Sequence, residues 1–260
     1  MADYFEALGL KKSFGTPEGR LDVLGGIDLA VREREFVCIM GTSGCGKSTL
    51  IRILEGIETP DEGQVVLEGA PLPSRPVKAV QKKFGIVFQS DNLLDWKNVY
   101  QNVALPLSAF KLKKQINAQK RIMEMLELVG LQDFKDCLPN ELSGGMRQRA
   151  AIARALVTDP DMLMLDQPFG ALDAITRKML NVQLLKIWRQ TQKTCIMITN
   201  NVNEALYLGQ RVLVLSKSPA KIVREFKVPF SYEERNADLG VHPEYLAMRD
   251  ALNHVIRSQK

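Results

Sequence analysis

The sequence predicts an α/β fold, in which a helical subdomain is inserted into a sheet domain and a short tail follows at the C-terminus. Short apolar runs recur along the chain with helical patterns between them, and such continuous apolar strands are typical of a parallel sheet covered on both faces. A second observation is that the pattern turns helical between about residues 90 and 160. The strand-like runs are residues 35–40, 65–67, 84–88, 162–165, 195–198 and 211–215.

The inserted subdomain is predicted from helical periodicity. Within residues 118–128 apolar side chains recur at Ile122, Met125 and Leu126, and the series continues at Val129. This spacing places the four side chains on one face of a helix. We therefore expect a helical layer here that buries one face.

The boundaries of the predicted domains follow from changes in these patterns. We expect a sheet core over residues 1–90 and 160–220, with the helical subdomain over residues 91–159. The extension over residues 221–260 begins with a short strand and has its last helix at residues 243–258. Some forty residues are too few for an independent core, so we expect the extension to pack on the sheet domain or on a neighbour.

Composition limits the class of protein. Of the 260 residues 45% are hydrophobic, which is enough for a well-buried core. No run approaches the roughly 18 uninterrupted apolar residues of a membrane-spanning helix, and the N-terminus lacks the pattern of a secretion signal. The net charge of +5 comes from basic residues interleaved with acidic ones. We expect a soluble, cytoplasmic protein and no nucleic-acid partner.

Cysteine and histidine chemistry is not prominent in this chain. The cysteines are far apart and lack metal-ligand spacing, which indicates reduced, unpaired thiols. They are Cys38, Cys45, Cys137 and Cys195. Since the two histidines, His242 and His254, lie close to the C-terminus, none is near the motifs for acid–base work.

A glycine-rich segment at residues 41–49 matches the phosphate-binding pattern of Gly, four residues, then Gly-Lys-Ser. Glycines let the backbone curl so that N–H groups face inward, and the following helix adds its positive end. An apolar strand before the segment and a helical pattern after it supply the required context. We predict that Lys47 contacts the β- and γ-phosphates and that Ser48 ligates Mg²⁺. The predicted nucleotide-binding residues here are Gly41, Ser43, Gly44, Cys45, Gly46, Lys47, Ser48 and Thr49.

Two further segments follow this loop along the chain. Ser143, Gly144 and Gly145 precede a helical run over residues 150–156. A hydroxyl and N–H groups at the start of a helix suit phosphate, although Ser-Gly-Gly is also a common helix cap. A later apolar strand ends in the carboxylate of Asp166. The order of loop, Ser-Gly-Gly segment and strand carboxylate makes the pattern specific.

This order of motifs resembles the ATP-binding subunit of ABC transporters, over roughly residues 5–225. The resemblance implies a P-loop NTPase fold of the RecA-like type that binds ATP and Mg²⁺. It implies a head-to-tail dimer in which each ATP lies between the phosphate loop of one chain and the Ser-Gly-Gly segment of the other. It also implies a transmembrane permease, a substrate-binding protein in the full system and a peripheral place on the cytoplasmic face of the inner membrane.

Further residues match motifs of the same family. Gln89 matches the glutamine that touches Mg²⁺ and links nucleotide to the permease, and Asp166 matches the carboxylate that holds Mg²⁺ through water. Asp173, in the loop of residues 170–173, resembles the aspartate that reaches across the dimer. Phe14 sits where the family stacks an aromatic ring on adenine. A phenylalanine in the core or at a strand edge is the alternative.

Three segments resemble one branch of the family in particular. Residues 92–96, 145–149 and 167–173 are similar to those of importers of nitrate, sulfonates, taurine and related small anions. Asp95 departs from the proline that is usual at its position. Because that segment faces the permease in the family, this departure weakens the substrate assignment and leaves the fold unaffected.

Two positions break the family pattern. The family places Glu after the Mg²⁺ aspartate to polarise the attacking water, and this chain has Gln167. An amide only hydrogen-bonds water, and general-base help is typically worth about 10²–10⁴ in rate. The histidine that contacts the γ-phosphate in the family is replaced by Asn200, unless Asn200 is only a turn residue at a strand end. We expect ATP to bind and to be hydrolysed slowly at this site.

Gln167 has two explanations: an engineered substitution that traps the ATP-bound state, or a native degenerate subunit. The second change at Asn200 favours the degenerate subunit, because blocking the base alone suffices for trapping. Since Ser143, Gly144 and Gly145 are intact, the chain is expected to complete a working site on a different ATPase subunit. Other functions with this fold are a soluble ATPase acting on DNA or ribosomes and a nucleotide-sensing regulator without a permease.

Overall fold

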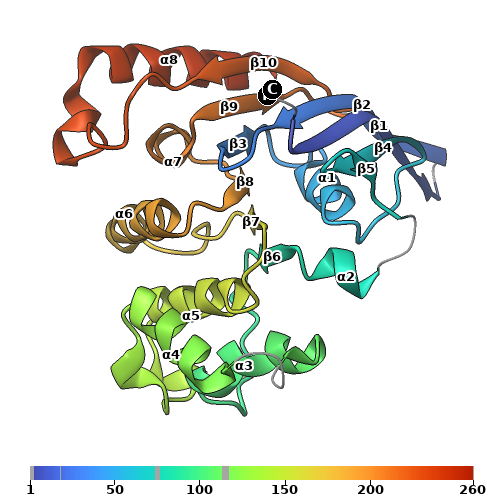
Figure 1. Ribbon diagram of the computed structural model, residues 1–260. Coiled ribbons are helices and arrows are strands. Elements are labelled where there is room, and N and C mark those ends of the chain that lie inside the picture. Colours follow the sequence, from blue (N-terminus) through green and yellow to red (C-terminus); the bar gives the residue numbers. More distant parts are fainter. Residues whose placement is uncertain (1–2, 18, 74–76, 113–116, 260) are drawn as a thin grey trace. The chain divides into compact units, whose positions relative to one another are not determined.

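The computed structural model describes residues 3–17, 19–73, 77–112 and 117–259, and Figure 1 shows its elements. The strands are β1 (Phe5–Thr16), β2 (Gly19–Val31), β3 (Phe36–Met40), β4 (Glu62–Leu67), β5 (Ala70–Pro71), β6 (Phe84–Val87), β7 (Met162–Asp166), β8 (Thr194–Ile198), β9 (Arg211–Leu215) and β10 (Ile222–Lys227). The α-helices are α1 (Lys47–Leu54), α2 (Lys78–Gln81), α3 (Val99–Ala109), α4 (Ala118–Leu128), α5 (Gly144–Leu156), α6 (Ala174–Thr191), α7 (Val202–Leu208) and α8 (Pro243–Ser258). Short 3₁₀ helices are η2 (Gln132–Phe134), η3 (Pro139–Glu141) and η4 (Ala237–Val241).

The chain divides into two compact units. Unit 1 comprises Met1–Pro76 and Thr194–Lys260, and unit 2 comprises Val77–Lys193. Unit 2 therefore holds α6 and the parallel pair β6 and β7 together with the helices of the predicted subdomain. The C-terminal extension belongs to unit 1. These boundaries differ from the three-part division made from the sequence, which stays a prediction.

The first sheet of unit 1 is largely parallel. β3 runs parallel to β8 on one side and to β9 on the other, and β10 adds antiparallel to β9. Every residue of β3 and β8 is buried, which explains their continuous apolar sequences. The parallel strands predicted at residues 35–40, 195–198 and 211–215 are thus confirmed.

The second sheet of unit 1 is antiparallel, with the order β2-β1-β4-β5. Assigning residues 65–67 to the parallel sheet was wrong, because β4 pairs antiparallel with both β1 and β5. All three residues are buried, so their sequence lacks the apolar–polar alternation that distinguishes an antiparallel strand. The alternation in β1 is interrupted by a register shift between Ala7 and Leu10, which moves the buried set to the other face.

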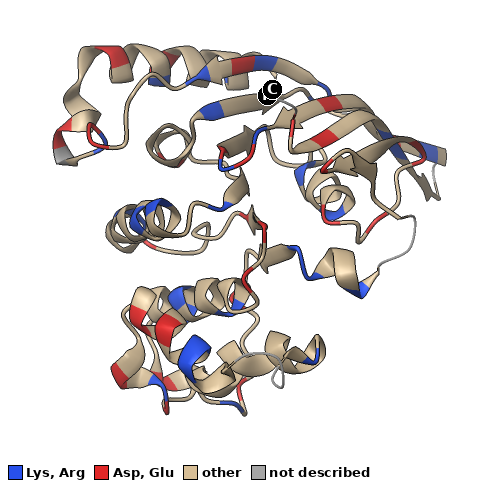
Figure 2. Ribbon diagram, viewed as in Figure 1, with Lys and Arg blue, Asp and Glu red and all other residues tan. Residues whose placement is uncertain are grey.

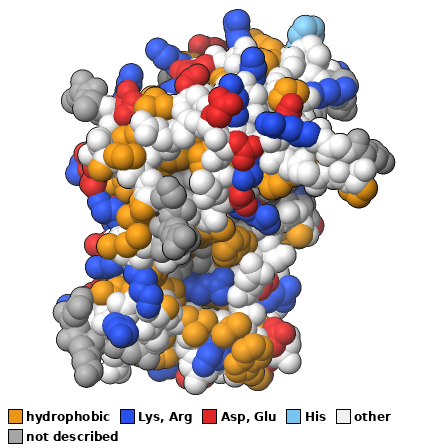
Figure 3. Space-filling view, turned by 90° about the vertical axis from the view of Figure 1, so that its right-hand side faces the viewer, with side chains coloured by type: hydrophobic (Ala, Val, Ile, Leu, Met, Phe, Trp, Pro, Cys, Tyr) orange, Lys and Arg blue, Asp and Glu red, His pale blue; other side chains and the backbone are white. Residues whose placement is uncertain are grey.

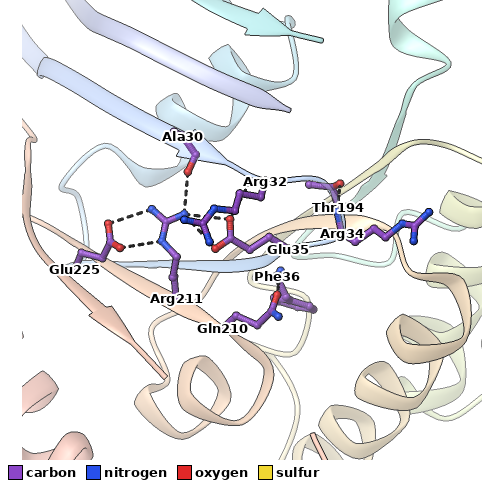
Figure 4. A network of polar contacts seen from close by, with 9 residues as sticks. All are labelled: Ala30, Arg32, Arg34, Glu35, Phe36, Thr194, Gln210, Arg211 and Glu225. Carbon is purple, nitrogen blue, oxygen red and sulfur yellow. Dashed lines mark hydrogen bonds and ion pairs between the residues drawn. The ribbon is translucent and has the colours of Figure 1, made fainter. Parts of the chain in front are cut away.

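A half-buried arginine, Arg211, ties three strands of unit 1 together (Figure 4). Arg211, at the start of β9, donates to both carboxylate oxygens of Glu35 at 3.2 and 3.1 Å and to the Ala30 carbonyl at 2.9 Å. On its other side it forms a two-pronged pair with Glu225 of β10, at 2.9 and 3.0 Å. The hydrogen bond from Arg211 holds the pKa of Glu225 below its ordinary value.

Unit 2 contains the predicted helical layer. Helix α4 begins and ends at the residues expected, and Ile122 and Leu126 are buried on its inner face. The Asn117 side chain accepts a hydrogen bond from the Lys120 N–H at 3.1 Å and caps the helix. Helices α3, α4 and α5 pack against one another in this unit. The prediction of helical structure over this stretch is confirmed.

The distribution of charges and the state of the cysteines agree with the expectations from the sequence. Acidic and basic residues are interspersed in both units (Figure 2), and on the face in Figure 3 they alternate with hydrophobic side chains. All four cysteines are free, as predicted. Within the described ranges, no helix combines the length and apolar composition needed to cross a bilayer. Residues 1 and 2, which belong to the segment used for the expectation about a secretion signal, lie outside the described residues.

Candidate nucleotide site

The predicted phosphate loop lies between β3 and α1 in unit 1, as the sequence pattern required. The loop curls around the ammonium group of Lys47, whose Nζ donates to the carbonyls of Gly41 at 2.9 Å and Thr42 at 2.7 Å. Lys47 is only 5% exposed. A buried positive charge within a curled glycine loop is the arrangement that a bound phosphate needs for its counter-charge.

Two glycines of the loop cannot be replaced without a clash. Gly46 has a φ of 101°, and an ideal Cβ there would lie 2.7 Å from Val23 Cγ1. At Gly41 a Cβ would meet Cys45 Sγ at 2.7 Å. Gly44 has a φ of 79° with open space around it, so only its backbone conformation requires glycine. Glycine at these three positions is thus required by the backbone conformation of the loop, by close contacts, or by both.

The hydroxyl groups of the motif lie at the start of α1. Ser43 and Ser48 are exposed and Thr49 is half-buried. Ser48 and Thr49 belong to the first turn of α1, beside its first N–H groups, which is the environment expected for phosphate oxygens and a hydrated cation, while Ser43 lies in the loop before the helix. Cys45, the remaining loop residue, is buried against the loop and lies 3.9 Å from Lys47 Nζ.

Unit 1 also places Asn200 beside the phosphate loop. Ile39 of β3 is in register with Ile198 of β8, and the next residue, Thr199, donates its N–H to the Ile39 carbonyl at 3.2 Å. Asn200 follows directly and is exposed. Asn201, and not Asn200, is the helix cap here, since its side chain accepts from two N–H groups of α7. The turn explanation thus holds for Asn201, and the role of Asn200 stays a prediction.

Two of the three predicted Mg²⁺ residues, Gln89 and Asp166, lie in unit 2, whereas Ser48 lies in unit 1. Asp166 is the last residue of β7, and Gln167 follows with a φ of 45°. The Gln167 carbonyl accepts from the Gly170 N–H at 3.0 Å. A Cβ on Gly170 would lie 3.8 Å from Gln167 Cβ and 3.9 Å from Gln89 Nε2. Gln89, two residues past β6, is therefore a neighbour of this loop, and the carboxylate and amide oxygens suit Mg²⁺.

Asp173 starts α6 as its cap. Its Oδ1 accepts from the N–H groups of Ile175 and Thr176, each at 3.0 Å. The hydrogen bonds from Thr176 are the main cause that lowers the pKa of Asp173, so the exposed side chain is a carboxylate at neutral pH. The structure thus shows Asp173 as a helix cap, and its role across a dimer stays a prediction.

The Ser-Gly-Gly segment begins α5. The Ser143 hydroxyl accepts from the Met146 N–H at 3.2 Å and caps the helix, so the cap explanation holds for the free chain. A Cβ on Gly145 would meet Thr176 Cγ2 at 3.0 Å, and one on Gly144 would meet Leu172 Cδ2 at 3.0 Å. The segment thus packs against the loop and helix that carry Asp173, within unit 2.

Phe14 lies near the end of β1 and is 39% exposed, so it is not a core residue. The Nζ of Lys12 lies 5.3 Å from the centre of its ring. The exposed ring is compatible with stacking on a base, and the cation of Lys12 lies over one of its faces.

Sequence reasoning missed the residues that hold the segment after Gln89. Asn102 is fully buried and bonds the Leu94 N–H and carbonyl together with the carbonyls of Lys97 and Asn98. Two arginines of α5 hold the start of the same segment at residues 91–92. Spacing gave no signal for these contacts, because an asparagine in a helix is usually exposed or a cap.

The fold and the phosphate loop define a nucleotide-binding protein of the P-loop class. Residues 24–170 match the ABC transporter family, which shows that the chain belongs to it. It is an ATP-binding subunit of an ABC transporter. The predicted fold class and the resemblance stated from the motifs are both confirmed.

Relatives and solved structures agree with this assignment. The nitrate import ATP-binding protein NrtD of Synechococcus elongatus is 39% identical over 98% of this chain and 91% of that protein. The taurine import ATP-binding protein TauB of Rhizobium johnstonii is 40% identical over 94% of this chain and 93% of that protein. A dimeric post-hydrolysis structure of the ATP-binding cassette MJ0796, bound to ADP and phosphate, has a TM-score of 0.74 at 32% identity, over 87% of this chain and 100% of that one.

Proposed function

We propose that this chain is the motor subunit of an importer for a small anion such as nitrate or a sulfonate, and that its own site binds Mg-ATP but hydrolyses it slowly. The observation that carries the second part is Gln167 at the end of β7. The names of the nitrate and taurine relatives support the substrate class.

The chemistry at the end of β7 accounts for slow hydrolysis. A carboxylate in place of Gln167 would accept a proton from water or orient it strongly, whereas the amide only hydrogen-bonds it. Mg²⁺, when held by Ser48, Gln89 and Asp166, would neutralise charge on the phosphates. Gln167 then leaves the attacking water without a base, which costs about 10²–10⁴ in rate.

Asn200 weakens a second contribution. It lies past β8, next to the strand that leads into the phosphate loop. Asn is shorter than His and carries no charge at any physiological pH, so it stabilises developing negative charge on a terminal phosphate less well. The two substitutions act on the same reaction, one on the water and one on the phosphate.

The intact Ser143, Gly144 and Gly145 favour an asymmetric pair of ATPase subunits. In a head-to-tail dimer these residues would complete the site of the partner chain, which needs its own Glu and His to turn over. A pair of identical chains would have two slow sites, whereas a mixed pair would have one working site. We therefore infer that the physiological partner is a different ATPase subunit.

The permease surface is proposed to include the segment after Gln89. Trp96 is 75% exposed, and the buried Asn102 holds its loop through hydrogen bonds to the backbone of Leu94 and Lys97. A rigid loop that presents a large aromatic side chain is suited to bind a partner. Contact with a transmembrane permease would place the chain at the cytoplasmic face of the membrane, in a system that includes a substrate-binding protein.

The test is single-turnover and steady-state ATP hydrolysis by the purified chain. We expect Mg-ATP to bind while phosphate release stays slow, and we expect Gln167→Glu combined with Asn200→His to raise the rate at least about tenfold. Each single substitution should give a smaller gain. Gln167→Asn, which keeps the amide, is the matched control and should leave the rate low. Hydrolysis by the unmodified chain at ordinary transporter rates would contradict the proposal.

A further inference from the structure

The C-terminal extension holds both ends of helix α7, the helix that follows Asn200. Strand β10 leads from the sheet into this extension, and α8 packs against α7 (Figure 1). All of these residues belong to unit 1, as does the phosphate loop. The contacts at the two ends of α7 are made by different side chains, Arg235 and Tyr245.

Arg235 closes the C-terminal end of α7. It is 4% exposed, and its guanidinium donates to the Tyr207 carbonyl at 2.7 Å and to the Gly209 carbonyl at 2.9 Å. It also donates to the Phe230 carbonyl, and it lies 4.5 Å from the centre of the Tyr232 ring. A cation at the last carbonyls of a helix satisfies them and interacts favourably with the helix dipole.

Tyr245 holds the first turn of α7. Its ring is buried next to Phe230, at 6.0 Å between ring centres, and its hydroxyl donates to Asn203 Oδ1 at 3.1 Å. Asn203 donates its own N–H to the side chain of Asn201, the cap of α7, at 2.9 Å. Two hydrogen bonds through Asn203 thus link the Tyr245 hydroxyl of α8 to Asn201, the residue that follows Asn200.

Asn200 has fixed neighbours on either side. The N–H of Asn201 donates to Thr199 Oγ1 at 3.0 Å, and that hydroxyl in turn donates to the buried carboxylate of Glu204 in α7. The Thr199 N–H is bound to the Ile39 carbonyl, one residue before the end of β3. A displacement of α7 would therefore move Asn200 relative to the loop that begins at the end of β3.

We propose that Arg235 and Tyr245 are positioning residues that set Asn200 against the terminal phosphate of bound ATP, so that the C-terminal extension tunes discrimination between ATP and ADP. This inference rests on the proposed nucleotide site and assigns the extension a role in it. Neither side chain touches nucleotide. Both act through α7.

The buried place of Arg235 carries an energetic cost. Burial lowers the pKa of Arg235, because removing the charged guanidinium from water costs free energy even when carbonyl groups bind it. An apolar side chain would cost less to bury, but it would donate to none of the three carbonyls that the guanidinium binds. The geometry that the guanidinium fixes is that of α7 against Phe230 and the extension.

The experiment measures the dissociation constants of ATP and ADP, both with Mg²⁺, for the full chain. Tyr245→Phe removes only the hydroxyl, and we expect it to weaken ATP about threefold to tenfold while ADP changes less than about twofold. Arg235→Lys should act in the same direction. Asn200→Ala should give the same selective loss, and Asn200→Ala with Tyr245→Phe should lose no more than Asn200→Ala alone. Tyr100→Phe, in unit 2, is the matched control and should change neither constant.

The outcomes separate the inference from the function on which it rests. Equal losses for ATP and ADP in Tyr245→Phe and Arg235→Lys would mean a structural role only, and would overturn the inference. Additive losses in the double variant would overturn it as well, since the two residues would then act separately. If the unmodified chain bound neither nucleotide, the proposed function itself would fail. A melting temperature for each variant shows whether unit 1 remains folded during the measurements.

Discussion

Gly46 combines a left-handed backbone, with φ at 101°, and a close approach to Val23. A side chain at Gly46 would both strain the backbone and overlap Val23, because Val23 of β2 packs against the loop at this position. Gly69 has a φ of 75° with nothing within 4 Å of an added Cβ, so it carries the strain alone. Comparing alanine substitutions at Gly46 and Gly69 therefore separates the effect of backbone strain from the effect of steric overlap.

We expect Gly46→Ala to cost about 2–3 kcal/mol in the free energy of unfolding and to abolish Mg-ATP binding. Gly69→Ala should cost about 1 kcal/mol and leave nucleotide binding unchanged. Urea denaturation and nucleotide titration measure the two effects. Normal ATP affinity in a folded Gly46→Ala protein would show that the loop tolerates a displacement of Val23.

Gln167 also lies in the left-handed region, with φ at 45°. Because glutamine and glutamate have the same shape and neither is a glycine, Gln167→Glu leaves the backbone strain of this turn unchanged. A change in rate in that variant would thus report the chemistry of the side chain and not a repositioned loop. The sequence alone identified Gln167, but only the structure shows its left-handed backbone, which Gln and Glu adopt with equal strain.

At the level of elements, the Arg211 network ties β9 to β10 and to the residue before β3. Since the Arg211 hydrogen bond lowers the pKa of Glu225, the carboxylate contributes stability above its unfolded pKa. That contribution is lost as the pH falls through the lower, folded pKa. The side chain of Glu225 is 39% exposed, so solvent screening limits the gain to about 1 kcal/mol or less.

We therefore expect Glu225→Gln to lower the free energy of unfolding at pH 7 by up to about 1 kcal/mol, and the difference from the unmodified chain to shrink as the pH falls below 4.5, the ordinary pKa of glutamate. Glu62→Gln breaks an ion pair with Lys11 whose side chains are 51% and 65% exposed, and it should have a smaller effect. Denaturant titrations at pH 7 and below pH 4 test this. A difference that persists in acid would place the stabilisation elsewhere.

Elements with a strong period were predicted well, and others were not. Helix α4 has the predicted bounds, and the apolar series that predicts it ends at Val129, the C-cap of the helix, because one buried face sets the period. β1 and β2 were missed, because register shifts break their alternation and many of their residues are exposed. Burial of β4 along its apolar run hid its antiparallel pairing. Strand direction depends on distant partners, which a local pattern does not contain.

On the scale of the whole molecule, unit 1 is built from the two ends of the chain. The C-terminal extension contributes fully buried Leu252 to this unit, and it packs on α7 without forming a separate domain. This agrees with the expectation that so short a tail needs a neighbour. Folding of the nucleotide loop region is then coupled to residues more than two hundred positions away in the sequence.

We expect Leu252→Ala to destabilise the protein by about 2–5 kcal/mol, which is typical of a cavity in a core. His254→Ala, an exposed position on the same helix, should stay within about 0.5 kcal/mol of the unmodified chain. Both are measured by urea denaturation followed by circular dichroism. A loss below about 1 kcal/mol for Leu252→Ala would indicate that the extension is peripheral to the core.

The order of loop, Ser-Gly-Gly segment and strand carboxylate determined the family from the sequence alone, because these motifs work through backbone N–H groups and a few charged side chains at fixed positions along the chain. The replacements at Gln167 and Asn200 were visible for the same reason. Tertiary structure alone decided that Arg235 and Tyr245 hold the helix after Asn200, and that Asn102 holds the loop of Trp96. These contacts join side chains to backbone or side-chain atoms of other segments, and no spacing in the sequence encodes which acceptor a buried donor will meet.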